Sequence, residues 1–143
     1  MVDNDPRLIL PGSHARAVAT ALSLLERDLF LVEALVAADQ VGIVVSTRTG
    51  LDARQREHMQ RRIREIRAEI AALAATFSLP HHVRDGRRII SGHLSERWAD
   101  LGDTRPAKLA RYGQLDPALA AVLDPPIARL TELVEAMCKE VEQ

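Results

Sequence analysis

The chain has little cysteine and few aromatic residues. Its 143 residues include one cysteine, one tryptophan, one tyrosine and two phenylalanines. A single cysteine, Cys138, excludes an internal disulfide, so the sequence favours a reducing compartment. Cys138 lies near the end of an apolar row and is expected to be a small core residue.

The chain also lacks a long uncharged run. The richest apolar stretch, residues 15–38, is interrupted by Arg16, Glu26, Arg27, Asp28 and Glu33. A membrane-spanning helix needs roughly 20 nearly uncharged residues. The start carries Asp3 and Asp5 where a secretory signal has a basic head. We therefore expect a cytoplasmic protein that does not associate with a membrane.

Three rows of apolar residues recur every three or four positions. The first row is Val18, Leu22, Leu25, Leu29, Val32 and Val36, the second is Met59, Ile63, Ile66, Ile70, Leu73 and Phe77, and the third is Ile127, Leu130, Val134, Met137 and Val141. This spacing places each row on one face of a helix that must be buried against another helix. The sequence therefore predicts an all-α fold in a single domain over residues 1–143. The expected architecture is an elongated up-and-down helical bundle, built on a long antiparallel helix hairpin with shorter C-terminal helices.

The first helix is expected over residues 14–41. Ser13 is its predicted N-cap, and Gly42 is the predicted left-handed residue beyond its end. Residues 1–12 contain two prolines and are expected to form an irregular N-terminal arm. The β-branched residues of the segment 43–51 do not alternate with polar ones, which favours at most a short extended segment and no sheet.

The second helix is expected over residues 53–78, with Asp52 as its cap and Pro80 just beyond its end. A third, shorter helix ending at Gly102 follows. The alternative for the start of that segment is a small hairpin over residues 82–90, because Asp-Gly is a favoured two-residue turn.

Prolines mark the expected helix starts in the last third of the chain, because a proline in the first turn lacks only an N–H that would be unpaired there. They predict helices over residues 106–112, 117–123 and 125–142.

A second flank of the first predicted helix is apolar. Leu24, Leu31 and Leu35 lie off the first row, as does Phe30. Either the C-terminal helices of the same chain cover this flank or a second subunit does, because monomers rarely expose a large apolar patch and symmetric dimers are common. We expect a homodimer, with Leu24, Leu31 and Leu35 as partner-binding residues.

The second candidate surface contains Trp98, Arg105 and Tyr112. Tryptophan, tyrosine and arginine are the residue types that anchor binding hot spots. The alternative is that Trp98 closes the end of the bundle while neighbouring cations extend around it. A protein partner is expected here if one binds a single chain.

Four residues could ligate a metal by their chemistry: His81, His82, His93 and Glu96. A catalytic zinc needs three protein ligands. Adjacent His81 and His82 tend to point apart, and the order of His93 and Glu96 reverses the one that di-iron bundles use. We therefore expect no metal and no cofactor. A small-molecule or metal-dependent enzyme that uses these four residues is the alternative function.

The second predicted helix carries six arginines: Arg54, Arg56, Arg61, Arg62, Arg64 and Arg67. Guanidinium groups can neutralise nucleic-acid phosphates, but acidic residues interleave with these arginines and are typical of a solvated helix face. Nucleic-acid binding is thus the least favoured alternative. The function expected first is that of a non-enzymatic helical interaction or regulatory module.

Overall fold

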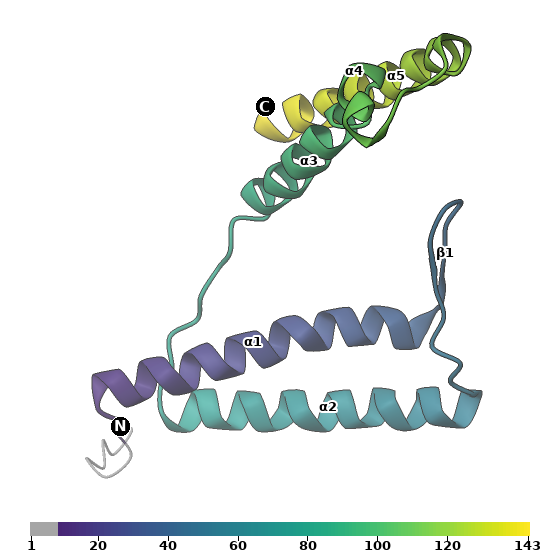
Figure 1. Ribbon diagram of the computed structural model, residues 1–143. Helices are drawn as coiled ribbons and strands as arrows, with labels where there is room; N and C mark the ends of the chain where they lie inside the picture. Colours follow the sequence, from purple (N-terminus) through teal and green to yellow (C-terminus); the bar gives the residue numbers. More distant parts are fainter. Residues whose placement is uncertain (1–8) are drawn as a thin grey trace. The chain divides into compact units, whose positions relative to one another are not determined.

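The computed structural model describes residues 9–143. The chain divides into two compact units, and the boundary between them in the sequence lies between His82 and Val83 (Figure 1). The predicted all-α class is confirmed, since helices dominate both units and the sheet has only two residues in each strand. None of the helices described combines the length and apolar composition needed to cross a bilayer. The single domain expected from the sequence stays a prediction, and each unit is described by itself.

The first unit is built on two antiparallel helices, α1 (Gly12–Ala37) and α2 (Ala53–Thr76), which lie side by side in Figure 1. Its core contains Leu29, Ile63 and Ile70. These residues belong to the first two apolar rows, so the 3.6-residue periodicity correctly predicts which faces of these helices pack together.

Both ends of α1 differ from the prediction. The helix begins at Gly12 after Pro11, so Ser13 lies inside the first turn and the predicted cap is wrong. The helix ends at Ala37, and Ala38 is already extended with φ −160° and ψ 148°. The expected continuation to residue 41 is wrong because the following backbone pairs with a strand.

That strand pairing forms a small hairpin between the two helices. Strand β1 (Gln40–Val41) pairs antiparallel with β2 (Ser46–Thr47), with Gln40 opposite Thr47. The expectation that this region holds no sheet is therefore wrong. Gly42 does not terminate α1 but permits the tight turn, because a Cβ there would lie 2.2 Å from the carbonyl oxygen of Val45. We call residues 40–47 the finger.

Arg56, in the first turn of α2, links the finger to both helices. Its guanidinium donates hydrogen bonds to the backbone oxygens of Leu35, Val36 and Leu51, to the Asp39 carboxylate and to the Thr49 hydroxyl. The shortest of these, 2.6 Å, joins Nη1 to the oxygen of Val36. Because the last carbonyls of a helix have no partner within it, Arg56 supplies the donors that allow α1 to end at Ala37.

The start of α2 confirms the predicted cap. The Asp52 carboxylate accepts a hydrogen bond of 2.8 Å from the backbone N–H of Gln55, whose side chain accepts one from the Asp52 N–H. This reciprocal capping box satisfies two backbone donors at the start of the helix. The helix ends at Thr76, two residues before the predicted end.

The second unit pairs α3 (Gly86–Gly102) with α5 (Pro117–Glu142), joined through α4 (Pro106–Leu109) and a 3₁₀ turn, η2 (Ala110–Tyr112). The alternative hairpin over residues 82–90 is wrong. The Asp85 carboxylate accepts hydrogen bonds from the backbone N–H groups at positions 87 and 88 and so caps α3.

Helix α5 is continuous through Pro125 and Pro126, so the predicted break at residue 124 is wrong. The φ angle of a proline is compatible with a helix. A proline has no backbone N–H, however, so one hydrogen bond of the helix is missing at each of these positions. Here Arg105 binds the carboxylate of Asp124, the residue just before the two prolines. Helix α3 packs along α5 as well.

We predict that Ile63→Ala destabilises the first unit by about 2 to 5 kcal/mol, because it leaves a cavity between α1 and α2. Ile63 is buried in the core, whereas Val83, the matched control, is exposed. Urea unfolding followed by circular dichroism measures the difference, and Val83→Ala should stay within about 0.5 kcal/mol of the wild type. Equal losses for both variants would contradict the assigned core.

Candidate interaction surfaces

The predicted partner-binding flank of α1 lies outside the core of its unit. Leu24 is 52% exposed and Leu31 is 59% exposed, while Leu35 is half-buried. The three leucines lie on one side of α1, since they follow each other at seven and four residues. We call this side the α1 flank.

The α1 flank continues beyond the three leucines as a regular row. Its members are Ala17, Ala21, Leu24, Asp28, Leu31 and Leu35. Their spacing alternates between four and three residues, which is the 3.5-residue repeat of a helix that pairs with another helix. The sequence analysis missed this row because its first members are small, and Asp28 interrupts it near its centre. A single polar residue within such a row sets the register of the paired helices.

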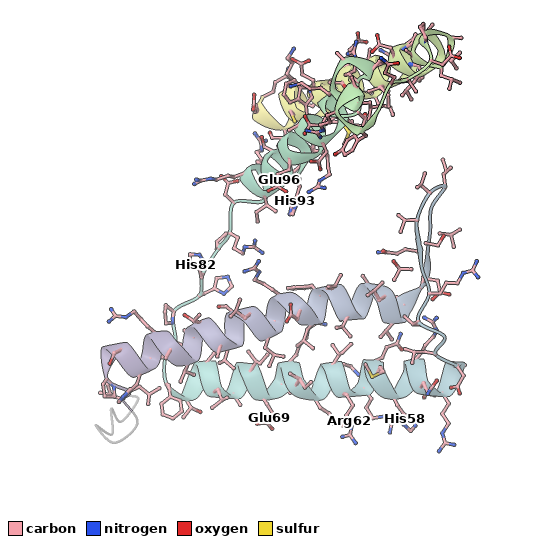
Figure 2. All side chains as sticks on the ribbon, viewed as in Figure 1. His58, Arg62, Glu69, His82, His93 and Glu96 are labelled. Carbon is pink, nitrogen blue, oxygen red and sulfur yellow. The ribbon has the colours of Figure 1, made fainter. Side chains whose placement is uncertain are left out.

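An apolar groove between α1 and α2 adjoins the α1 flank. Leu22 and Leu25 line it from α1, and Ile66 and Leu73 line it from α2. Arg62 and Glu69 also line this groove, and Figure 2 shows where both lie on α2. The flank and the groove together form one apolar face of the helix pair, bordered by charge.

The opposite face of the helix pair carries an ion pair and a cation–π contact. Arg67 forms an ion pair with Glu33 and lies over the ring of Phe30, with the guanidinium carbon 5.2 Å from the ring centroid. Phe30 is therefore partnered by its own chain through a cation–π contact. Since Arg56 and Arg67 both bind groups of their own unit, these two of the six arginines of α2 are engaged internally rather than free to contact phosphate.

The tip of the finger is the most exposed apolar segment of the structure described. Ile43 is fully exposed, Val44 is 97% exposed and Val45 is 74% exposed. The sequence analysis assigned no role to this segment, although three successive β-branched residues between Gly42 and Ser46 were a visible signal. Such side chains favour extended backbone, and their exposure places them outside the core of the first unit.

Hydrogen bonds to the carboxylate of Asp39 hold the base of the finger. The backbone N–H of Thr49 and the guanidinium of Arg56 lower the pKa of the Asp39 carboxyl below its ordinary value. The two hydrogen bonds to Asp39 Oδ1 measure 3.2 Å from Thr49 and 3.1 Å from Arg56. Asp39 therefore contributes to the stability of this region only while it is ionised.

In the second unit the residues Trp98, Arg105 and Tyr112 have different roles. Trp98 and Tyr112 are exposed, at 46% and 77%. Arg105 instead binds Asp124 with both arms of its guanidinium, and this hydrogen bonding raises the pKa of Arg105. The guanidinium of Arg105 is thus bound to a carboxylate of its own unit. The rings of Trp98 and Tyr112 are the exposed apolar part of the predicted surface.

The third apolar row contains both half-buried and exposed residues. Ile127, Val134 and Val141 are half-buried on α5, whereas Leu130 and Met137 are exposed. Further exposed apolar residues of α5 are Leu119, Val122 and Leu133. The second unit therefore also presents an apolar stripe, which the sequence analysis took for a wholly buried one.

The four residues of the metal-site alternative are divided between the units. His81 and His82 belong to the first unit, while His93 and Glu96 lie on α3 of the second; Figure 2 labels three of them. In residues 9–143, no three histidine, cysteine, aspartate or glutamate side chains are grouped in a way that could hold a metal ion.

Comparison of the chain with protein families, with curated proteins and with solved structures finds no match. The surfaces described above are therefore the observations from which a function can be inferred.

We predict that Asp39→Asn destabilises the first unit at neutral pH. The folded pKa of Asp39 lies below its unfolded value of about 3.9, so the stabilisation is present above that value and is lost as the pH falls through the folded pKa. Urea unfolding of wild type and variant between pH 7 and pH 2 measures the effect. The two curves should converge at the acidic end, and a constant difference across this range would contradict the assignment.

Proposed function

We propose that the chain is a non-enzymatic, homodimeric helical interaction module of the cytoplasm, in which the α1 flank binds a second copy of the chain. One observation carries the proposal. Among residues 9–143 only Leu29, Val36, Ile63 and Ile70 are buried, while the members of the α1 flank are exposed except for the half-buried Leu35.

A helix pair with so small a core gains stability when a further helix covers its exposed apolar face. Helices in water owe most of their stability to the burial of an apolar face against a neighbour, and small domains bury too little surface to be more than marginally stable. A second copy supplies this layer on the exposed face, where burying one leucine side chain contributes about 1.5 to 3 kcal/mol.

An antiparallel pairing of two α1 helices fits the row. A two-fold axis near Asp28 brings Leu24 of one copy beside Leu31 of the second copy, and Leu35 beside the small Ala21. Large side chains then face small ones at the ends of the row, leucines meet on either side of the axis, and Asp28 meets its own copy near the axis. The interface is self-complementary, as a closed two-fold dimer requires.

We expect Leu31→Asp to weaken the dimer by at least about 100-fold, because each copy would bury an unpaired carboxylate in an apolar interface. The side chain is largely exposed in the single chain, so the helical circular dichroism of the variant should match that of the wild type. Sedimentation equilibrium measures the dissociation constant.

The matched control for this experiment is Gln60→Asp, which introduces the same charge at an exposed position of α2. Its dissociation constant should equal that of the wild type. A wild-type chain that is monomeric at every concentration would refute the proposal, and so would a Leu31→Asp variant that dimerises as tightly as the control.

Asp28→Asn should tighten the dimer at neutral pH. The proposed axis brings the two Asp28 carboxylates close together in the interface. Two like charges about 4 Å apart repel by about 1 kcal/mol in water and by more where water is excluded, so the dissociation constant should fall by at least about fivefold. The same sedimentation experiment measures this change. A dissociation constant that Asp28→Asn leaves unaltered would place the axis elsewhere on α1.

A further inference from the structure

The first unit contains a cavity where the chain leaves α2. Its volume is about 230 Å³, and it lies between α1, α2 and residues 79–82. Ser78 has the left-handed backbone conformation, with φ 49°, and the backbone N–H of Leu79 donates a 2.9 Å hydrogen bond to the oxygen of Ala74. This turn is the Schellman motif that ends many helices. It directs residues 79–82 to the cavity, where they form one of its walls.

Two opposite charges line the cavity. Glu26 lies on α1 and Arg67 on α2. Arg67 forms its ion pair with Glu33 through Nη1 and none with Glu26. Its other terminal nitrogen, Nη2, is buried and has no hydrogen-bond partner within residues 9–143. Because a buried donor without an acceptor is destabilising, an acceptor that enters the cavity gains a hydrogen bond that the chain alone does not make.

Contacts outside the cavity fix the guanidinium of Arg67. Glu33 binds one of its nitrogens, and the guanidinium carbon lies 5.2 Å from the centroid of the Phe30 ring. A group that is already held in place loses little conformational entropy when a ligand binds. Guanidinium groups also match carboxylates in geometry and charge. Nη2 is therefore a preorganised donor for the carboxylate of a small ligand.

The rest of the cavity fits a small, partly apolar molecule. Leu22, Ile70 and Leu79 line it with aliphatic side chains, and the imidazoles of His81 and His82 line it from the segment that follows α2. Figure 2 labels His82 on that segment. A volume of about 230 Å³ equals that of about eight water molecules at about 30 Å³ each. This is the scale of one amino acid and is too small for a nucleotide or a peptide.

We propose that this cavity binds a free α-amino acid with an aliphatic side chain. The carboxylate of the ligand accepts the hydrogen bond from Nη2 of Arg67, and its ammonium lies beside the carboxylate of Glu26. Its side chain packs against the aliphatic residues of the cavity. A ligand with negative charge alone, such as phosphate, fits less well because Glu26 repels it. None of the three leucines of the α1 flank lines the cavity, so this inference does not rest on the proposed homodimer.

Isothermal titration calorimetry of the full chain with L-leucine tests the proposal. Two analogues of leucine each lack one charge, since isocaproate has no ammonium and isoamylamine has no carboxylate. We expect saturable binding of L-leucine and at least about tenfold weaker binding of each analogue, because each loses one charge-assisted contact. No binding of L-leucine would overturn the proposal, and so would tighter binding of isocaproate or of inorganic phosphate.

Glu26→Gln removes the charge that faces the ammonium. This variant should bind L-leucine at least about tenfold more weakly than the wild type and isocaproate more tightly, because a carboxylate is no longer repelled. Glu69→Gln is the matched control, since Glu69 is an exposed glutamate of α2 that does not line the cavity (Figure 2). Its dissociation constant for L-leucine should equal that of the wild type. Equal binding of L-leucine by the two variants would refute the role of Glu26 and, with it, the choice of an amino acid.

A variant that fills the cavity gives a test that does not depend on charge. Ala74→Leu places a larger side chain in the wall of the cavity and should abolish saturable binding of L-leucine. Ala72→Leu, at an exposed position of α2 outside the cavity, should leave binding unchanged. The helical circular dichroism of both variants should match that of the wild type. Equal binding of L-leucine by Ala74→Leu and Ala72→Leu would place the ligand elsewhere on the chain and overturn the proposal.

Discussion

The hydrogen bonds of Arg56 are the interaction on which the first unit depends. They bind the last carbonyls of α1, the base of the finger and the start of α2 to one guanidinium group. Without these donors, the carbonyls of Leu35 and Val36 would lose their protein partners at the point where α1 stops. The end of α1, the base of the finger and the start of α2 are thus all bound to this one side chain.

The same geometry leaves apolar surface that the first unit does not cover. Helix α1 carries two adjacent apolar rows, and α2 covers one of them. The other is the heptad row of the α1 flank, and the finger rises from the end of the helix that carries it. Two rows on one helix are typical of a helix with two neighbours. This is the physical reason for proposing a second copy as the missing neighbour.

Local signals in the sequence predicted the elements that depend on local physics. The apolar rows identified the packed faces of α1 and α2, and Asp52 was recognised as a helix cap because a carboxylate accepts from the next free N–H groups. The candidate site was predicted in part: Leu24 and Leu31 were identified, but the heptad row through Asp28 and the exposed finger were not. Their role depends on what lies next to them in space.

The sequence by itself determined the all-α class, the buried faces of the first two helices and most helix starts, because periodicity and capping act within a few residues of the chain. Only the tertiary structure decided where α1 ends, that residues 40–47 pair as strands and that α5 runs through two prolines. Arg56 binds the end of α1 from 20 residues further along the chain, and Arg105 binds Asp124 of α5 from 19 residues away. Periodicity and capping act over a few residues and do not encode such partners.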